Sequence, residues 1–310
     1  MNTDQVAIIG LGSQAKAWAL NLKDSGRDVF IILRDKSPSH ELARSMGLKT
    51  LSFEDELNSF DLIVMLTPDH IQYDLLKSYS HKFKNQATFV YAHGWSPIRG
   101  VLKDFPNFSH TLLAPKAIAS EVRFQYETKG KLGAAFCTKH AHNPNEAKEI
   151  IIKLAKDLGI TAGPYESTFE EETKADLFSE QTLLCSLLPY GALLSYNALR
   201  KSGVSKEVAF MECWLEVKLI ADALVKMGPI EFFQLISPNA LAGANKARQV
   251  LFDKEYRHKL DSLLHDIESG DFYRECENTN HQKLREEVLE QWRSQELCSV
   301  FEELKDELIP

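Results

Sequence analysis

The sequence predicts an α/β fold in which a doubly wound parallel sheet is followed by an all-α domain. Three observations support this. A glycine-rich turn follows the first apolar run, apolar runs of strand length alternate with helical segments as far as Gly163-Pro164, and only helical patterns follow that pair. We therefore expect a Rossmann-like domain at residues 1–163 and a helical domain at residues 164–310, joined by a linker turn.

Composition and charge narrow the class of protein. The chain has 310 residues, 44% hydrophobic and 26% charged, as expected of a soluble protein with two domains. Its formal charge of −8 argues against a nucleic-acid partner. The five scattered cysteines form no CxxC pair, which favours a reducing, cytoplasmic location. The first strand-like run begins within a few residues of Met1 and leaves no room for a signal peptide.

An uncharged segment, Thr182–Leu199, approaches the length of a membrane-spanning helix. It contains Pro189 and Gly191 and directly follows the acidic Glu180. We expect a deeply buried helix here rather than a membrane span.

The first apolar run leads into a pattern typical of dinucleotide binding. In VAIIGLGSQAKAWALNLKDSG, the residues Gly10, Gly12 and Ala15 fill the GxGxxG/A pattern, and Ser13 and Gln14 lie in the same turn. Glycines permit a tight turn and the close approach of a pyrophosphate to N–H groups at a helix start. A second strand-like run, Val29–Leu33, follows at the expected distance.

The residues after that second run indicate which dinucleotide binds. Arg34 could pair with a 2′-phosphate, and Ser37 and Ser39 could donate hydrogen bonds to it, which favours NADP. Asp35 could instead accept a hydrogen bond from a ribose hydroxyl, as in NAD-binding folds. A solvated polar loop is the remaining alternative.

Further strands and helices are predicted along the first half of the chain: strands at Leu62–Leu66, Thr88–Tyr91, Thr111–Leu113 and Ala134–Thr138, and helices at Pro68–Ser80 and Asn145–Leu158. Ligands bind beyond the carboxyl ends of the strands in such sheets. His93 and Lys116 each follow an apolar run closely, so both are candidate site residues, although a lone His or Lys is often structural.

Two pairs of carboxylates mark the helical half, where helices are expected at about 168–187, 189–201, 205–227 and 230–235, followed by charged segments from 253 to the end. Asp176 with Glu180, and Glu212 with Glu216, are each spaced i, i+4 and share a helix face. The second pair lies in an almost wholly apolar segment. Glutamates are rarely buried unless they are paired or bind metal, and carboxylates suit Mg²⁺ or Mn²⁺. Two solvated faces remain the alternative.

Taken together, the motifs resemble the short form of ketol-acid reductoisomerase. The segments that carry the resemblance are GLGSQAKAWALNLKDSG, LRDKSPS, YAHGW, LLAPK, ESTFEEETKADLFSEQTLLC, MECWLEVKLIAD and LISPNA. They occur in the order and spacing of that family, and the resemblance fades after about residue 250.

The resemblance implies a reaction in branched-chain amino-acid synthesis. A 2-acetohydroxy acid such as 2-acetolactate undergoes alkyl migration with Mg²⁺, and NADPH then reduces it to a 2,3-dihydroxy acid. It also implies roles for single residues. Metal binding falls to Asp176, Glu180, Glu212 and Glu216, the last also catalytic, with the second pair supplied by a partner subunit. His93 and Lys116 are the other catalytic residues, Ser237 contacts the substrate carboxylate, and Arg34, Ser37 and Ser39 bind the 2′-phosphate.

Three departures from the family pattern point to an altered substrate fit. The lysine motif, usually PKGPGH, continues here as Ala117-Ile118-Ala119-Ser120, and Ser186-Leu187 replace two glycines after the first acidic helix. Pro238-Asn239 follow Ser237 in place of an acidic and a hydroxyl residue. A reductase of another 2-oxo acid and a catalytically silent nucleotide-binding protein therefore remain alternatives.

The apolar helices also predict an oligomer. The segments 182–199 and 205–227 need more cover than one small helical domain offers, so we expect a homodimer or a larger assembly with a shared active site.

Overall fold

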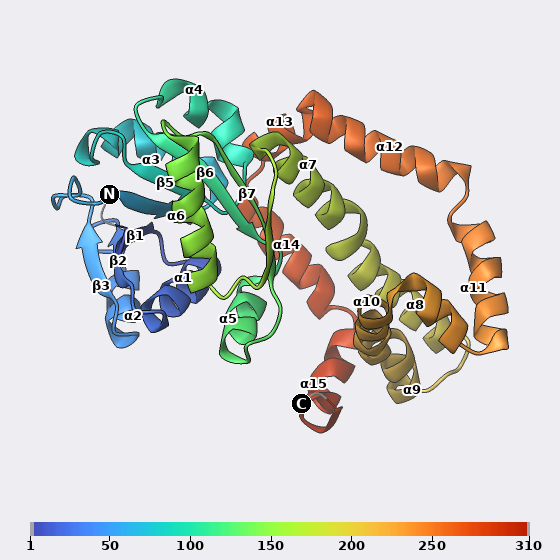
Figure 1. The fold of residues 1–310 in the computed structure, drawn as a ribbon. Helices are drawn as coiled ribbons and strands as arrows, with labels where there is room; N and C mark the ends of the chain where they lie inside the picture. Colours follow the sequence, from blue (N-terminus) through green and yellow to red (C-terminus); the bar gives the residue numbers. More distant parts are fainter. Residues whose placement is uncertain (1–2, 309–310) are drawn as a thin grey trace. The chain divides into compact units, whose positions relative to one another are not determined.

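The computed structural model describes residues 3–308, which form a sheet domain and a helical domain (Figure 1). By contacts the chain divides into one unit up to Thr173 and a second from Lys174 onward. The predicted fold class, a doubly wound α/β domain followed by an all-α domain, is confirmed.

The sheet has eight strands in the order β3-β2-β1-β4-β5-β6-β7-β8. Their bounds are β1 (Gln5–Ile9), β2 (Asp28–Leu33), β3 (Lys49–Ser52), β4 (Leu62–Met65), β5 (Thr88–Tyr91), β6 (Ser109–Pro115), β7 (Gly133–His140) and β8 (Ala162–Glu166). All neighbours pair in parallel except β6 and β7, where Pro115 lies opposite Ala134. The sheet is therefore mostly parallel, as predicted, and the reversal at β7 is a detail that an apolar run does not indicate, since such a run carries no information on strand direction.

Both faces of the sheet are buried, as expected of a parallel sheet with helices on each side. Alternate residues of β1 point to opposite faces, with Val6 and Ile8 in one hydrophobic cluster and Ala7 and Ile9 in the other. The surrounding helices are α1 (Ser13–Asp24), α2 (Ser39–Ser45), α3 (Asp69–Tyr79), α4 (Leu102–Asp104), α5 (Ala119–Glu127) and α6 (Pro144–Asp157), with a 3₁₀ turn at Ser80–Lys82 and a π-helical turn at Pro97–Val101.

The pair Gly163-Pro164, where the sequence indicates a linker turn, lies in a strand. Gly163 and Pro164 are part of strand β8, which pairs with β7 and completes the sheet. An edge strand therefore lies where the sequence predicts a linker turn. The prediction failed because a Gly-Pro pair is typical of turns, although Pro is also tolerated in edge strands. Helix α7 (Phe169–Ser179) begins within the first unit and continues into the second.

The second unit is entirely helical within the described residues. Beyond α7 it contains α8 (Leu187–Lys201), α9 (Lys206–Phe210), α10 (Glu216–Leu235), α11 (Pro238–Leu251), α12 (Lys254–Ser269), α13 (Asp271–Glu277), α14 (His281–Arg293) and α15 (Glu296–Leu308), with π-helical turns at Glu180–Leu184 and Met211–Leu215. Gly228, with φ 76°, breaks α10 ahead of Pro229. The break agrees with the two separate helices predicted on either side of it.

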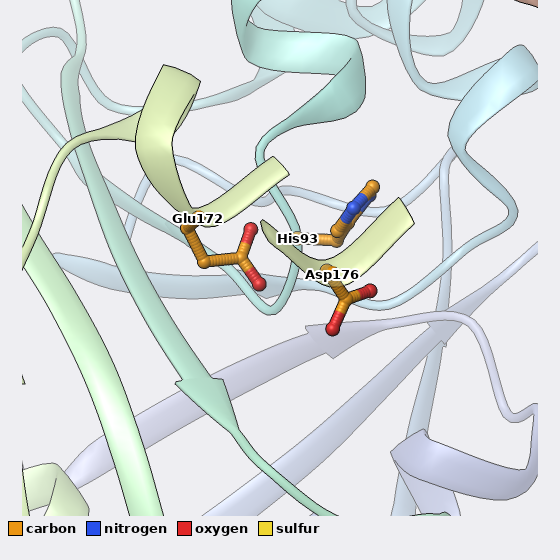
Figure 2. Close-up of side chains that lie close together, drawn as sticks. All are labelled: His93, Glu172 and Asp176. Carbon is orange, nitrogen blue, oxygen red and sulfur yellow. The ribbon is translucent and has the colours of Figure 1, made fainter. Parts of the chain in front are cut away.

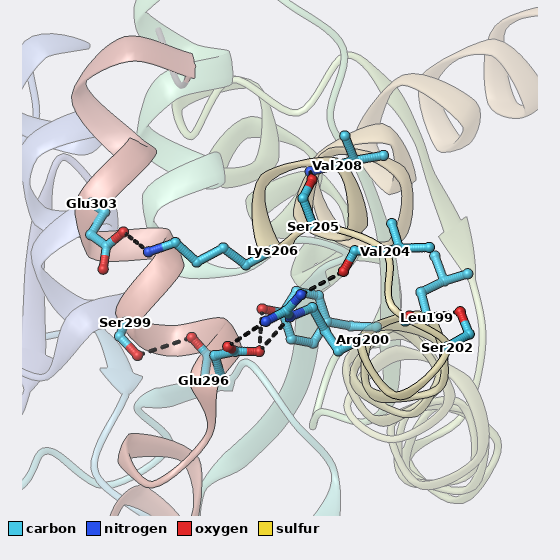
Figure 3. A network of polar contacts seen from close by, with 11 residues as sticks. Leu199, Arg200, Ser202, Val204, Ser205, Lys206, Val208, Glu296, Ser299 and Glu303 are labelled. Carbon is cyan, nitrogen blue, oxygen red and sulfur yellow. Dashed lines mark hydrogen bonds and ion pairs between the residues drawn. The ribbon is translucent and has the colours of Figure 1, made fainter.

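A polar network ties the last helix to α8 and α9 (Figure 3). Arg200 donates to both carboxylate oxygens of Glu296 at 2.8 and 3.0 Å, and the Tyr196 hydroxyl donates to Oε2 at 2.9 Å. Hydrogen bonds from Arg200 and Tyr196 lower the pKa of Glu296 to about 2. Leu297 and Val300 of α15 are buried beside this network, so the C-terminal segment is part of the core as well as charged on its outer face.

The apolar helices of the second unit are largely uncovered. The helical stretch Phe169–Lys201 is long and apolar enough to cross a membrane, and only 11% of its most apolar window is buried within the chain. On α10, Leu219, Val225 and Ile230 are 61%, 85% and 72% exposed. The expectation that Thr182–Leu199 is deeply buried is thus wrong for the single chain. An apolar composition indicates that a helix packs against other apolar surface, but it does not indicate whether that surface belongs to the same chain.

Candidate active site at the carboxyl edge of the sheet

The glycine turn between β1 and α1 is built to receive an anion. Gly10 has φ +98°, and a Cβ there would meet Thr67 at 3.0 Å, so this position favours glycine. Gly12 is the N-cap of α1, has open space around it, and makes no side-chain cap hydrogen bond. The N–H groups of Ser13 and Gln14 open the helix, and such groups bind phosphate oxygens.

The loop after β2 places the three residues predicted for the 2′-phosphate close together in sequence and space. Arg34 is exposed, its carbonyl accepts from Ser37 N–H at 3.1 Å, and Ser39 N–H donates to Ser37 Oγ at 3.3 Å. Beside them lies a cavity of about 580 Å³ whose lining includes Lys36 and Arg44 together with the acidic Asp35, Glu41 and Asp55. Cations and anions therefore both face the position where the adenosine ribose of a dinucleotide would bind.

Lys116 and a buried glutamate form the polar centre of the sheet's carboxyl edge. Lys116 directly follows β6, and its Nζ lies 2.6 Å from Oε1 of Glu172 on α7. The other oxygen, Oε2, accepts from Gly94 N–H at 3.2 Å, and the Glu172 side chain is only 1% exposed. Burial of a carboxylate is tolerable when it is paired and hydrogen-bonded in this way.

Gly94 is what allows α7 to approach the loop after β5. A Cβ at Gly94 would lie 2.5 Å from the Phe169 carbonyl oxygen and 2.3 Å from Thr173 Oγ1. The preceding residue, His93, is partly buried, and its Nδ1 lies 3.8 Å from Oδ1 of Asp69 at the start of α3. This close packing brings His93 to the same edge as Lys116, as the sequence predicts for residues that follow β5 and β6.

Figure 2 shows His93 and Glu172, with Asp176 one turn further along α7. Each of the three offers one ligand atom, and these atoms lie within 4.8 Å of one another. Oxygen and nitrogen donors at this spacing can hold a divalent cation. Within this group, Glu172 already accepts two hydrogen bonds, from Gly94 and from Lys116.

Both predicted acidic pairs lie at π-helical turns. Glu180 opens the turn Glu180–Leu184, in which Cys185 N–H donates to the Glu180 carbonyl at 3.0 Å. Glu212 lies within Met211–Leu215, and Glu216 begins α10 directly after it. π-Helical turns are rare in proteins as a whole, but those that occur are often at functional sites.

The single chain does not gather all four acidic residues into one group. Among residues 3–308, the three-residue group around Glu172 is the one set of potential metal ligands found, and Glu212 and Glu216 are exposed. Ser237 lies elsewhere, as the exposed N-cap of α11, where its Oγ accepts from Ala240 N–H at 3.2 Å. The contribution of these three residues to an active site stays a prediction.

Glu172 is the site residue that sequence reasoning missed. It lies in the run Glu170-Glu171-Glu172, which reads as a solvated helix start. The signal that could have found it is helical periodicity, because Glu172, Thr173, Asp176 and Leu177 follow the buried Phe169 at i+3, i+4, i+7 and i+8.

The fold and this edge define the class of protein: an NAD(P)-dependent oxidoreductase with a dinucleotide-binding sheet domain. Residues 1–163 match "Acetohydroxy acid isomeroreductase, NADPH-binding domain", and residues 169–309 match "Ketol-acid reductoisomerase, C-terminal domain". The chain therefore belongs to the ketol-acid reductoisomerase family, whose members are NAD(P)-dependent oxidoreductases that also isomerise their substrate. The match extends to residue 309, well past residue 250, where the sequence motifs fade.

Solved structures agree with this assignment. An NADH-preferring ketol-acid reductoisomerase from an uncultured archean is 26% identical, with 99% of this chain and 95% of that chain covered and a TM-score of 0.90. A semialdehyde dehydrogenase NAD-binding protein from Cupriavidus necator is 18% identical, with 86% and 98% covered and a TM-score of 0.66. A 1-pyrroline-5-carboxylate reductase from Streptococcus pyogenes is 17% identical, with the same coverages and a TM-score of 0.58. The last two show similarity of fold alone.

Proposed function

We propose that the protein is a Mg²⁺- and NADPH-dependent reductoisomerase of 2-acetohydroxy acids. It would convert 2-acetolactate to a 2,3-dihydroxy acid in branched-chain amino-acid synthesis. The observation that carries the proposal is the Lys116–Glu172 pair, which lies one helical turn from Asp176 at the edge of the sheet where a dinucleotide binds. Family membership and the glycine turn at Gly10 and Gly12 support it.

The residues present fit both absent groups. The uncapped N–H groups at Ser13 and Gln14 fit a pyrophosphate, and the carboxylates on and after α7 fit a hard divalent cation. When bound, NADPH would supply a hydride and Mg²⁺ would supply Lewis acidity. Asp176, Glu180 and the second acidic pair would hold the metal.

Lys116 would act on the substrate oxygens directly, and Glu172 would position it. The ammonium group of Lys116 donates hydrogen bonds to developing negative charge, and Glu172 keeps that ammonium in place through the 2.6 Å contact. Glu172 is itself fixed by Gly94 N–H, so the pair is preorganised before substrate arrives. His93 lies at the same edge and can hold or donate a proton.

We further propose that Glu212 and Glu216 complete the metal site of a second copy of the chain. Both are exposed, and both lie at a π-helical turn on helices whose apolar side chains are uncovered. A homodimer would cover those side chains and bring the second acidic pair to a site that one chain leaves incomplete. We place this assembly in the cytoplasm, because the chain's five cysteines are free thiols.

NADPH is the cofactor that the loop after β2 favours, through Arg34, Ser37 and Ser39. The opposing consideration is Asp35, which could bind a ribose hydroxyl, and the printed preference of the archaeal relative is for NADH. Comparison of kcat/KM for the two cofactors tests the preference. A higher kcat/KM for NADH would contradict it.

A coupled assay tests the reaction itself. We expect NADPH oxidation that requires both 2-acetolactate and Mg²⁺, and an Asp176→Asn variant that retains dinucleotide binding but loses turnover. Asp176 is partly buried on α7, and replacement by asparagine keeps its size while removing its charge. If the wild-type protein turned over no faster than this variant, the proposed reaction would be excluded.

One observation favours a second candidate, a reductase of a different 2-oxo acid. Ile118, in the loop that follows Lys116, is 74% exposed where the family pattern has a compact glycine-rich turn. An apolar side chain beside the site would change which substrate substituent fits. Turnover of a simple 2-oxo acid, with 2-acetolactate inert, would select this alternative.

A further inference from the structure

The glycine turn and the Lys116 loop are joined by one side chain. Gln14, the second residue of α1, donates from Nε2 to the carbonyl of Ala117 at 3.1 Å. Ala117 is the next residue after Lys116. The two segments lie more than a hundred residues apart in sequence, and each belongs to a different function, dinucleotide binding and contact with substrate.

Helix α5, which follows the Lys116 loop, is fixed to α1 at a second place. Asn21 is fully buried and donates from Nδ2 to the Val122 carbonyl at 3.3 Å, while Arg123 donates to Asn21 Oδ1 at 2.9 Å. The backbone N–H of Lys116 donates to Gly133 on the β7 side at 2.9 Å. The short loop from Lys116 to Ile118 thus connects β6 to α5, and α5 is itself hydrogen-bonded to α1.

The Gln14 side chain uses its amide nitrogen for the hydrogen bond to Ala117. Its Oε1 atom is buried and has no hydrogen-bond partner among residues 3–308. A buried acceptor without a partner destabilises the fold, and such exceptions in native proteins call for an explanation. The contact from Nε2 to the Ala117 carbonyl fixes the amide in the orientation that leaves Oε1 unpaired.

We propose that Gln14 is a positioning residue that couples the dinucleotide phosphates to Lys116. The inference rests on the proposed function. The backbone N–H of Gln14 lies in the first turn of α1, where a phosphate would bind, and its side chain holds the Ala117 carbonyl. Phosphate binding fixes the first turn of α1, which in turn fixes the loop that aims the Lys116 ammonium toward Glu172. By linkage, Lys116 and the dinucleotide then influence each other equally.

The reactivity of Lys116 towards acetic anhydride measures this coupling without turnover. The probe is 2′-phospho-ADP-ribose, which carries the pyrophosphate but lacks the nicotinamide ring and so cannot shield Lys116 itself. In the wild-type protein, we expect its binding to slow Lys116 acetylation about three- to tenfold, as expected for one hydrogen bond gained or strengthened. Lys201, at the end of α8, serves as the internal reference.

Gln14→Met keeps the length of the side chain and the backbone N–H but removes the hydrogen bond. We expect this variant to bind the probe in calorimetry and to show no change in Lys116 acetylation. Its kcat should fall by a similar factor, and because the coupling is reciprocal, its affinity for the probe should fall by up to the same factor. Gln125→Met on α5 is the matched control, since the Gln125 side chain donates to Glu121 on the same helix.

Two results would overturn the inference. If Gln14→Met bound the probe and still slowed Lys116 acetylation as the wild type does, the coupling would not run through Gln14. If the wild-type protein bound the probe with no change at Lys116, there would be no coupling to transmit. A chain that bound no probe would remove the proposed dinucleotide function along with it, and calorimetry separates that case from the others.

Discussion

At the scale of single residues, the site depends on a buried carboxylate that holds a lysine. Glu172→Gln keeps the hydrogen bond from Gly94 but removes the charge that faces Lys116. Because a hydrogen bond between charged partners contributes about 1.5–3 kcal/mol, we expect kcat to fall roughly 10- to 100-fold with dinucleotide affinity unchanged. Glu170→Gln, an exposed neighbour on α7, is the control. Equal kcat in both variants would show that Glu172 is not needed.

A second residue, His110, makes stability depend on pH. It lies in β6 and is 2% exposed, with Nε2 2.8 Å from the Phe105 carbonyl and Nδ1 3.1 Å from the Tyr91 hydroxyl. Burial lowers the pKa of His110 from 6.5 to about 4, so the neutral ring is favoured in the folded protein. The unfolded chain therefore takes up a proton at higher pH than the folded one.

The stability contributed by neutral His110 is complete above pH 6.5 and is lost as the pH falls towards 4. The loss is on the order of 3 kcal/mol in the free energy of unfolding. Urea unfolding between pH 7 and pH 4 measures it, and His110→Gln should show a shallower slope. If the two proteins lost stability in parallel over this range, His110 would not be its source.

The candidate site was only partly predictable from single residues. Gly10, Gly12, His93 and Lys116 could be found because each follows a strand that apolar runs mark clearly. Glu172 was harder to find, since it is the last of three consecutive glutamates and such a run is typical of a solvent-exposed helix start. The expectation that Glu212 and Glu216 meet Asp176 across a subunit interface rests on the family resemblance alone, because no spacing in one chain describes an interface.

At the scale of elements, the approach of α7 to the loop after β5 positions the site. Gly94→Ala would force its Cβ to 2.5 Å from the Phe169 carbonyl, so α7 or the loop must shift. Overpacking of this kind costs about 1–3 kcal/mol, and thermal unfolding should detect it. Gly12→Ala is the matched control, because its Cβ would meet no atom within 4 Å. An unchanged Tm for Gly94→Ala would contradict the packing described here.

Element prediction from sequence succeeded where periodicity was strong and failed where direction or edge position mattered. Strand β5 lies at Thr88–Tyr91 as predicted, and α6 agrees to within a residue at each end. Strands β3 and β8 are short edge strands with mixed polar content, so no apolar run marks them. The antiparallel pairing of β7 depends on how the chain returns after α5, which local sequence does not encode.

At the scale of the whole molecule, the exposed apolar side chains of α8 and α10 predict self-association. Light scattering should give at least twice the chain mass of 35.1 kDa. Val225 is 85% exposed on α10, and Val225→Asp should shift the assembly towards monomer by placing a charge in the interface. Ile152→Asp on α6 is a control with an exposed apolar residue in the other unit. A wild-type protein that is monomeric at micromolar concentration would argue against a shared site.

Binding of Mn²⁺, followed by electron paramagnetic resonance, tests the central claim that carboxylates from both acidic pairs hold divalent cations. Mn²⁺ suits the same oxygen ligands as Mg²⁺ and its signal changes on binding. We predict that the wild-type protein binds Mn²⁺, and that Asp176→Asn and Glu216→Gln each weaken binding strongly while Glu170→Gln does not. Equal Mn²⁺ binding by all four proteins, or none by the wild type, would contradict the account.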